Sequence, residues 1–378
     1  MRFTNNQLKD FKIVDICKLK QGNQYDLKQQ FTEEKSDLKR FIRIIDYTQK
    51  TNDIRYVYSN GSENYVDCTD VVVVRYGASA GYVGRGINGI IANNLFTIRP
   101  INSALLNKSY LYHYLNAPVI QKQLNNTQSS GMPALNFQTI NNLHILLPEY
   151  QEQRQIAVFL DKIDERIQTQ IKIIGDYNSL KKGIIQHIFN VNYEFPNVHL
   201  KAVLKEISQK NKNRDNIDVL SVSNSLGFIK QSEQFEDREI ASADTSNYKI
   251  VNKNEYAYNP ARINVGSIAR LQSCDCGIVS PMYTVFKTDI SKISYEYFDL
   301  FLQSSTFQKQ LNQKLEGSVR QCLTFASMQN ILIELPPLEM QIEISEKMKF
   351  IDSKIKIESD YLNLLKTEKE YLLKNMFV

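Results

Sequence analysis

The sequence predicts an α+β chain in which two mixed α/β domains alternate with two long helices that form an antiparallel coiled coil. A segment of 43 residues that begins LPEYQEQ at Leu147 returns, without a gap, as LPPLEMQ at Leu335. Both copies place apolar residues in alternating steps of four and three, which is the spacing of a coiled-coil seam. A repeat of this length indicates an internal duplication with pseudo-two-fold symmetry.

The repeat sets the predicted boundaries. The first domain takes residues 1–147 and its helix residues 148–190, and the second domain takes residues 191–335 and its helix residues 336–378. Each helix starts with a proline, which suits a first helical turn. A helix of about 40 residues is about 60 Å long. Helices of that length are uncommon in globular domains, so we expect the two to pair with each other.

The two copies share nine of their 43 residues, and a chance resemblance between two helix starts is the alternative to duplication. The matching apolar register favours duplication. The identical pairs are Leu147/Leu335, Pro148/Pro336, Gln153/Gln341, Ile156/Ile344, Ile163/Ile351, Asp164/Asp352, Ile167/Ile355, Lys181/Lys369 and Phe189/Phe377.

The apolar seams are interrupted at the same two places in both copies. Gln170 aligns with Glu358, and Lys181 aligns with Lys369. Polar residues in a seam can fix register and partner. The seam residues of the first helix are Ile156, Leu160, Ile163, Ile167, Ile174, Tyr177, Ile184 and Ile188, and we expect the first four to face Ile344, Met348, Ile351 and Ile355. The second seam continues with Leu362, Leu365, Leu372 and Met376.

The domains repeat as well. QKQLN occurs at 121–125 and at 308–312, and each domain ends in an alternating apolar stretch, 145–147 and 333–335, that predicts a closing strand. Gly81 corresponds to Gly266. Apolar runs predict strands at 40–46, 70–77 and 276–286, and amphipathic patterns predict helices at 109–124 and 294–311.

The composition is that of an ordinary globular protein with a net charge of +5. The positive excess lies in residues 1–147, which hold 17 Lys and Arg against 11 Asp and Glu. This permits nucleic-acid binding without arguing strongly for it. Five irregularly spaced cysteines predict no disulfide framework, and no apolar run is long enough to span a membrane. We expect a soluble, cytoplasmic protein.

At this point the pattern resembles the specificity subunits of type I restriction-modification systems along the whole chain. The resemblance rests on LPPLEMQ and its twin LPEYQEQ, on the Ile-Asp-x-[Lys/Arg]-Ile segments at 163–167 and 351–355, and on DVVVVRYGASAGYVG at 70–84. Two departures limit the transfer of individual residues. The second copy has YNPARINVG where a glycine-rich stretch is usual, and the chain lacks tryptophan.

The resemblance implies two target recognition domains, each reading one half of a two-part DNA site, and two helices that set the spacing. It implies two methyltransferase subunits and restriction (helicase-nuclease) subunits as partners. S-adenosylmethionine, ATP and Mg are then expected only in those partners, and this chain would be non-catalytic. A coiled-coil scaffold that does not read DNA is the alternative function.

Candidate DNA contacts are polar residues that follow the predicted strands, because arginine suits guanine and Asn or Gln suits adenine. Arg75, Arg85 and Arg262 rank first because they flank loops where backbone can approach DNA closely. The first domain contributes Arg43, Thr48, Arg75, Tyr76, Ser79, Tyr82, Arg85, Asn88, Asn93 and Asn94, and the second contributes Ser223, Asn224, Lys230, Arg262, Asn264, Arg270 and Arg320.

Catalytic or metal-binding motifs are incomplete. YNPAR at 258–262 lacks the second proline and the aromatic residue of an amino-methyltransferase motif, and GASAGYVGRG at 77–86 lacks the GK[ST] ending of a phosphate-binding loop. Neither CDC at 274–276 nor the four histidines have the spacing of a metal site. Gln153, Arg154, Asp161 and Glu165 are expected on the outer helix face, where they either bind a methyltransferase or face water.

Overall fold

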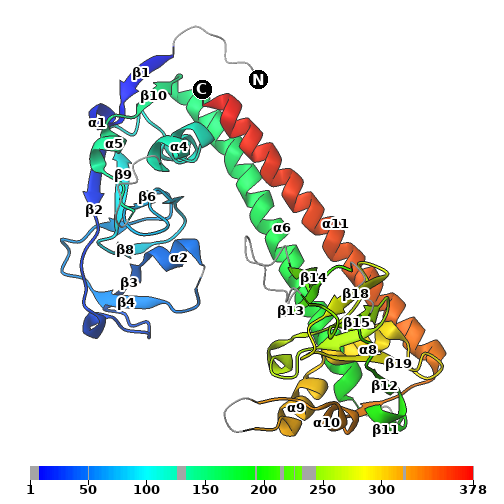
Figure 1. Cartoon of the computed structure of the whole chain (residues 1–378). Helices are drawn as coiled ribbons and strands as arrows, with labels where there is room; N and C mark the ends of the chain where they lie inside the picture. Colours follow the sequence, from blue (N-terminus) through cyan, green and yellow to red (C-terminus); the bar gives the residue numbers. More distant parts are fainter. Residues whose placement is uncertain are drawn as a thin grey trace. The chain divides into compact units, whose positions relative to one another are not determined.

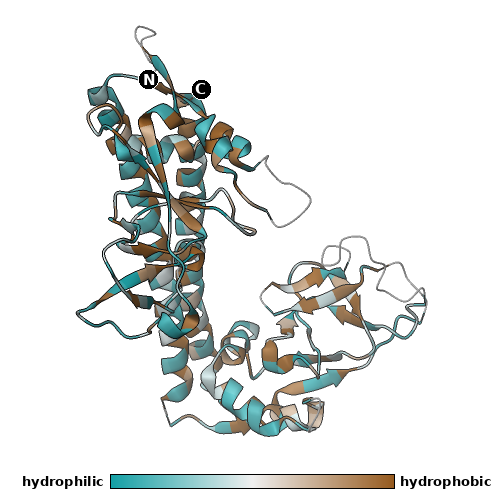
Figure 2. Cartoon of the chain, turned by 90° about the vertical axis from the view of Figure 1, so that its left-hand side faces the viewer, coloured by the Kyte–Doolittle hydropathy of each residue, from teal (hydrophilic) through white to brown (hydrophobic). Residues whose placement is uncertain are grey.

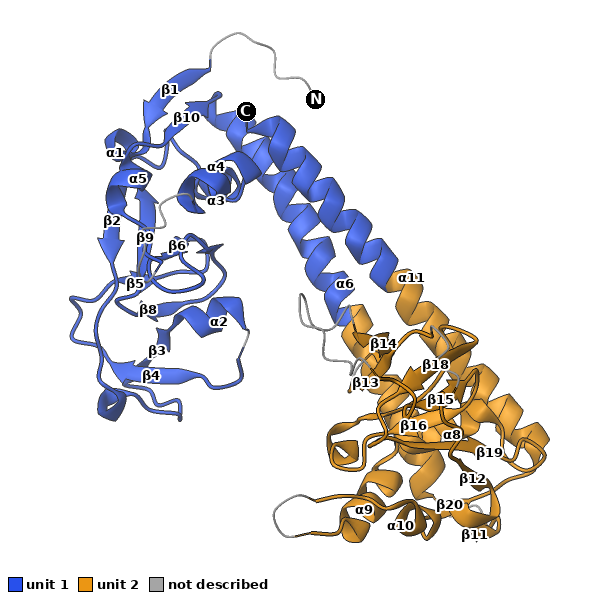
Figure 3. Ribbon diagram, in the orientation of Figure 1, with its two compact units in different colours: residues 1–172, 359–378 blue, residues 173–358 orange. Residues whose placement is uncertain are grey.

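The computed structural model describes residues 8–49, 51–125, 133–191, 194–212, 217–224, 226–231, 244–317 and 321–377. It divides into two compact units (Figure 3). The first unit comprises residues 1–172 and 359–378, and the second comprises residues 173–358. Each unit therefore combines one globular domain with a section of each long helix.

The first globular domain is built on a four-stranded antiparallel sheet in the order β2-β9-β6-β7. All four valines of β6 are buried, because the sheet is covered on both faces. A second sheet has the order β4-β3-β8-β5, and β1 pairs with β10. The strands are β1 (Lys9–Lys12), β2 (Cys17–Gln21), β3 (Leu38–Ile42), β4 (Arg55–Tyr58), β5 (Tyr65–Val66), β6 (Val71–Val74), β7 (Val83–Gly84), β8 (Gly89–Ile91), β9 (Leu95–Pro100) and β10 (His144–Leu147).

The helices of the first domain correct two predictions. The strand predicted at 40–46 ends at Ile42, and a helix follows because Asp46 accepts the backbone N–H of Arg43 at the helix start. The helix predicted at 109–124 is broken before Pro118, which cannot continue a helix. The helices are α1 (Ile13–Ile16), α2 (Ile44–Thr48), α3 (Lys108–Leu115), α4 (Pro118–Asn125) and α5 (Phe137–Asn141).

The second domain repeats the same core sheet, in the order β12-β19-β16-β17. The smaller sheets pair β13 with β14, β15 with β18 and β11 with β20. The strands are β11 (Asn197–His199), β12 (Leu204–Ile207), β13 (Leu220–Ser223), β14 (Gly227–Lys230), β15 (Lys249–Asn252), β16 (Tyr256–Tyr258), β17 (Ile268–Arg270), β18 (Cys276–Val279), β19 (Thr284–Thr288) and β20 (Leu332–Glu334).

The single strand predicted at 276–286 is therefore two strands, which belong to different sheets. The helix predicted at 294–311 is also two helices, because Ser304 caps the start of the second one. The helices of this domain are α8 (Tyr295–Leu302), α9 (Ser305–Lys314) and α10 (Phe325–Gln329).

The correspondence between the two domains is confirmed in detail. Gly81 and Gly266 have φ of 91° and 95°, so both use the left-handed conformation that favours glycine. The closing strands β10 and β20 lie directly before the long helices, as predicted.

The two long helices are α6 (Tyr150–Asn190, 41 residues) and α11 (Leu338–Met376, 39 residues). They run side by side in Figure 1, and hydrophobic and hydrophilic residues alternate along them in Figure 2. The predicted seam residues are all buried or half-buried. The predicted antiparallel coiled coil is thus present in each unit.

The residues that each seam contacts differ from the predicted pairing of the two helix starts. In the first unit Ile156 and Leu160 share a core with Leu365, Leu373 and Phe377. In the second unit Met348 shares a core with Ile185 and Phe189, and Ile344 and Ile351 pack on that core. An antiparallel pair brings the start of one helix to the end of the other, so the expected contact of Ile156 to Ile167 with Ile344 to Ile355 was wrong.

The repeated seam lysines form two equivalent ion pairs. Lys369 of α11 binds Asp164 of α6 in the first unit. Lys181 of α6 lies 2.5 Å from Asp352 of α11 in the second unit. Both members of each pair are repeated 188 residues apart, so one duplicated pair of residues holds the helices in register twice.

The repeated glutamine anchors each domain to its helix. Gln153 is 1% exposed and accepts the N–H of Asn107, the residue that caps α3, while its own amide donates to Leu105 and Pro148. Gln341 is fully buried and makes the same three bonds to Ser294, Lys292 and Pro336. Gln153 is therefore not on the outer face as expected.

Within the described part of the chain, none of the helices has the length and hydrophobicity of a membrane span. The five cysteines are free.

Candidate nucleic-acid interface

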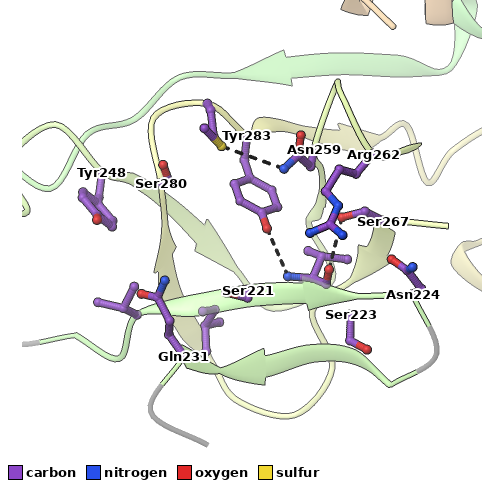
Figure 4. Close-up of a pocket in the computed structure, with 14 residues that line it drawn as sticks. Ser221, Ser223, Asn224, Gln231, Tyr248, Asn259, Arg262, Ser267, Ser280 and Tyr283 are labelled. Carbon is purple, nitrogen blue, oxygen red and sulfur yellow. Dashed lines mark hydrogen bonds between the residues drawn. The ribbon is translucent and has the colours of Figure 1, made fainter. Parts of the chain in front are cut away.

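The second unit contains a polar pocket with a volume of about 610 Å³ (Figure 4). Its walls come from β13, from the loops that follow β16 and β18, and from residues that flank β14 and β15. The lining residues are Val219, Leu220, Ser221, Val222, Ser223, Asn224, Gln231, Tyr248, Asn259, Arg262, Ser267, Ser280, Met282 and Tyr283.

Internal hydrogen bonds hold the walls of this pocket in place. The Ser267 hydroxyl donates to the carbonyl of Val222 at 3.1 Å, and the Val222 N–H donates to the Tyr283 hydroxyl at 3.4 Å. These bonds tie β13 to the two loops opposite it. Hydroxyl and amide groups line the described walls together with one arginine and no carboxylate. This composition suits a ligand with negative charge and hydrogen-bonding edges.

Arg262 gives the pocket its positive charge. It starts a short helical turn, Ile263–Val265, after β16, and its side chain is exposed. Figure 4 shows Arg262, Asn259 and Asn224 at one end of the pocket and Tyr248 and Gln231 at the other. Among the described arginines of the two globular domains, Arg262 is the one whose guanidinium has no hydrogen bond, ion pair or ring contact.

The structure brings three second-domain candidates together in this pocket: Ser223, Asn224 and Arg262. The other described candidates of this domain are not among the lining residues. Lys230 lies 2.8 Å from Asp218, Asn264 is exposed on the same loop as Arg262, and Arg270 binds Asp299. Arg320 lies outside the described residues.

In the first unit the arginine candidates are engaged by other residues. Arg43 pairs with Asp46 and Asp53 at 3.3 and 3.1 Å. Arg75 binds Gln21 and stacks on Phe137, with 4.2 Å between the guanidinium carbon and the ring centroid.

Arg85 binds Asp161 of α6, and its guanidinium carbon lies 3.9 Å from the centroid of the Tyr112 ring. Asp161, like Gln153, is thus not a free residue of the outer helix face. Arg154 and Glu165 are exposed there, as expected.

The remaining first-domain candidates are dispersed over helix α2 and several loops. Thr48 donates to Ile44 within its own helix, and Tyr76 forms a β-bridge with Ala134. Ser79 and Asn94 are half-buried. Tyr82, Asn88 and Asn93 are exposed.

His113, Asp161 and Asp164 place ligand-type atoms within 4.8 Å of one another. Their environment is that of an ion-pair network. Burial would raise the pKa of Asp161, but hydrogen bonds from His113, Arg85 and Ser109 hold that pKa well below its usual range. Asp164 is bound by Lys369. Because cations already bind both carboxylates, the cluster does not fit a metal site.

Sequence reasoning did not select most of the pocket lining. Asn259 follows a strand just as the selected residues do, so the same rule could have found it. Tyr248, Gln231 and Tyr283 carry no such signal, because they come from separate segments that meet only in the folded domain.

Comparison with known proteins places this chain in a family. A model described as the type I restriction modification DNA specificity domain matches residues 5–174 and 205–367. The MjaVIII type I restriction enzyme specificity subunit of Methanocaldococcus jannaschii is 23% identical over 337 residues, which cover 80% of this chain and 77% of that protein. The putative MjaX specificity subunit of the same organism is 26% identical over 371 residues, covering 91% and 79%.

Solved structures show the same fold. A type I restriction-modification S subunit from M. genitalium superposes with a TM-score of 0.58 at 15% identity, over 100% of this chain and 98% of that one. A chain from a study of complex assembly and conformational transition in a type I system gives 0.58 at 13% identity, over 97% of each chain. The two family matches fall on the two halves of the duplication, and the chain belongs to the family of type I restriction-modification DNA specificity domains.

Proposed function

We propose that this chain is the DNA specificity subunit of a type I restriction-modification complex, with one half of a two-part DNA site read by each globular domain. The single observation that carries the proposal is the match of the specificity-domain family to each half of the chain separately. A duplicated frame with two different loop surfaces is suited to an asymmetric two-part site.

The pocket of the second unit is the proposed base-reading site of that domain. Base edges are read by side chains that donate and accept hydrogen bonds, and arginine paired with guanine is the commonest specific contact. Arg262 is exposed, its guanidinium has no partner among the described residues, and Asn259 and Asn224 line the pocket beside it. Because the described lining holds no carboxylate, nothing in it repels DNA phosphates.

The first domain would use its exposed loops. Tyr82, Asn88 and Asn93 are exposed and stay candidates for base or phosphate contacts. Arg43, Arg75 and Arg85 would have to leave their present partners before binding DNA, so we give them the role of shaping these loops. The positive excess of this domain, 17 basic against 11 acidic residues over 1–147, supports its affinity for the DNA backbone.

The proposed partners are two methyltransferase subunits and the restriction subunits. Each unit exposes large apolar side chains on its helix sections, which favour docking of a protein surface. S-adenosylmethionine, ATP and Mg would act in the partners, this chain would contribute no catalytic residue, and the complex would act in the cytoplasm. The exposed side chains are Phe159, Leu364 and Tyr371 in the first unit and Leu180, Phe350 and Ile357 in the second.

Co-expression with a methyltransferase subunit of the same system tests the proposal. We expect a purified complex with two methyltransferase subunits per chain, and long-read sequencing of host DNA should give one two-part methylated motif with a fixed spacer. Phe350→Ser should reduce the yield of the complex, whereas Glu346→Ser on the same helix should not. Methylation with no defined motif would contradict the proposal and favour a scaffold that does not read DNA.

Arg262→Gln tests the pocket within the same assay. A lost arginine–guanine contact costs about 1–3 kcal/mol, so one base position in one half-site should lose its preference. Lys287→Gln removes the same charge from an exposed position outside the pocket and should leave the motif unchanged. Equal weakening at all sites would indicate a phosphate contact instead. An unchanged, fully methylated motif would remove the pocket from the proposal.

A further inference from the structure

In the first unit, one carboxylate of the long helix receives three groups of the globular domain. Asp161 of α6 lies 2.7 Å from His113 Nε2, 2.7 Å from the Ser109 hydroxyl and 2.5 Å from the Arg85 guanidinium. The side chain of His113 is fully buried, and that of Arg85 is 20% exposed. The domain therefore presents donors and positive charge to this helix position.

The second unit has the opposite charge at the same helix position. The two long helices align without a gap at an offset of 188 residues, which places Lys349 of α11 where α6 has Asp161. Lys349 reaches the carboxylate of Glu296 in α8 at 3.4 Å. Here the helix supplies a positive charge and the domain supplies the carboxylate, which also lies 3.6 Å from Arg270 of the same domain.

The domain side has changed together with the helix side. Helices α3 and α8 align on their capping residues Asn107 and Ser294, so Glu296 stands in the place of Ser109. Six residues after each cap, the buried His113 is replaced by the buried Leu300, which needs no acceptor on the helix.

The equivalent arginines of the two domains also differ in where their carboxylate partner comes from. Arg85 and Arg270 lie at corresponding places after the matching loop glycines. Arg85 takes its carboxylate from the long helix. Arg270 takes its carboxylate from its own domain, binding Asp299 of α8 at 2.7 and 3.0 Å.

Two further features of the junctions are shared. The glutamine of each long helix accepts the N–H of the residue that caps the domain helix. The phenylalanine near the end of the other long helix packs on equivalent aromatic rings, Phe377 on Tyr110 at 5.2 Å and Phe189 on Tyr297 at 5.2 Å between centroids. Because the two domain–helix junctions are otherwise similar, either domain could pack on either long helix. The charge at one helix position distinguishes the two junctions.

We propose that residues 161 and 349 form a charge code that assigns each globular domain to its own long helix. A first domain seated on α11 would set Arg85 and the buried His113 against Lys349. A second domain seated on α6 would set Glu296 against Asp161. Asp161 and Glu296 are half-buried, with 32% and 34% of their side chains exposed, whereas Lys349 is 63% exposed. Like charges and unsatisfied polar groups beside the half-buried carboxylates and the buried His113 disfavour both exchanges. The code concerns folding and domain order, so it is independent of the DNA-reading function.

A transplant of the second code into the first unit tests the proposal in the full chain. Asp161→Lys should speed amide hydrogen exchange in α3 by about tenfold or more, because three donors lose their acceptor. Adding Ser109→Glu and His113→Leu should recover most of the protection, since the introduced carboxylate could then face the introduced lysine as Glu296 faces Lys349. The same two domain substitutions alongside the native Asp161 should reduce protection. Gln155→Lys, which adds a lysine at an exposed position of α6, is the control and should change little.

The informative quantity is the sign of the coupling between the helix and domain substitutions. If Asp161→Lys alone leaves the chain unfolded and the triple variant folds, the code is supported. Additive losses, or a triple variant no better protected than Asp161→Lys, would overturn it. Peptide-resolved exchange measured by mass spectrometry reports α3 and α8 separately, so an intact second unit verifies that each variant chain is otherwise folded.

Discussion

Gln153 and Gln341 explain physically why the motif LPxxxxQ recurs. The first backbone N–H groups of a helix have no partner within the helix, so a capping residue binds them. In α3 and α8 the capping residue must itself be held in position. One buried glutamine amide joins the cap, the loop before it and the proline carbonyl of its own helix. The side chain is thus a joint between domain and helix, a role that its polar character in the sequence did not reveal.

Gln153→Leu should therefore lower the free energy of unfolding of the first unit by at least about 2 kcal/mol. Buried backbone groups would lose their hydrogen-bond partners, and no solvent could reach them to replace those partners. Denaturant unfolding measures the loss of stability, and hydrogen exchange shows whether it is located in α3. Gln155→Leu, two residues away and exposed, is the matched control and should stay within about 0.5 kcal/mol of the parent. Equal effects at the two positions would rule out the joint.

His113 makes the first unit less stable as the pH falls through the range in which histidine takes up a proton. Burial lowers the pKa of His113, so the unfolded chain binds a proton more readily than the folded one. Stability is then full above the ordinary histidine pKa and falls as the pH drops through about 6.5.

Exchange in α3, corrected for intrinsic rate, should accelerate between pH 7 and about 5.5, because this window lies around and below the ordinary histidine pKa. Helix α8 has Leu300 at the equivalent place, and burial raises the pKa of its own Asp299, which favours the folded state as the pH falls, so α8 should not accelerate. His113→Leu paired with Asp161→Asn should flatten the response of α3. A parallel response of α3 and α8 would contradict the assignment to His113.

Residue roles were the part of the site that the sequence predicted least. Arg85 qualified as a DNA contact because it flanks a glycine-rich loop, yet its partner Asp161 lies 76 residues away in the chain. Local pattern carries no information about such a pairing. Arg262 met the same rule, and its side chain has no partner within the described ranges.

At the scale of elements, the two long periodic helices and the closing strands were predicted correctly, whereas several of the shorter apolar runs were not. The heptad seams fixed both long helices, since a pattern sustained over about 40 residues has few alternatives. The segment at 40–46 is apolar in both halves, so its change from β3 to α2 depends on one carboxylate, Asp46. The helix breaks within 109–124 and 294–311 depend on a proline and a capping serine. The prediction gave more weight to the continuous apolar pattern than to these two residues.

The repeated lysine–aspartate pairs make unequal contributions to the helix pair. Lys369→Met should destabilise the first unit by about 1 kcal/mol, because both partners are mostly shielded, with 18% and 23% of their side chains exposed. Lys181→Met should cost less, since Asp352 is 51% exposed and solvent screens that pair. Thermal unfolding at low and high salt measures the difference. A larger loss for Lys181→Met would contradict the shielding argument.

At the scale of the whole molecule, the duplication was visible in the sequence and the division into compact units was not. Each unit takes the start of one long helix and the end of the other, because antiparallel pairing brings those sections together around one domain. The pocket of the second unit draws on segments from Val219 to Tyr283, and only the folded sheets bring them together. Sequence reasoning placed three of its residues and could not outline the pocket.

We propose that each globular domain reads its own half of the DNA site. Replacement of residues 191–335 by the corresponding domain of another family member, in a chain co-expressed with the methyltransferase subunit, tests it most directly. Long-read sequencing of the methylated host DNA should show one half of the motif changed, with the other half and the spacer length unchanged. A motif that changes in both halves, or in neither, would contradict the account.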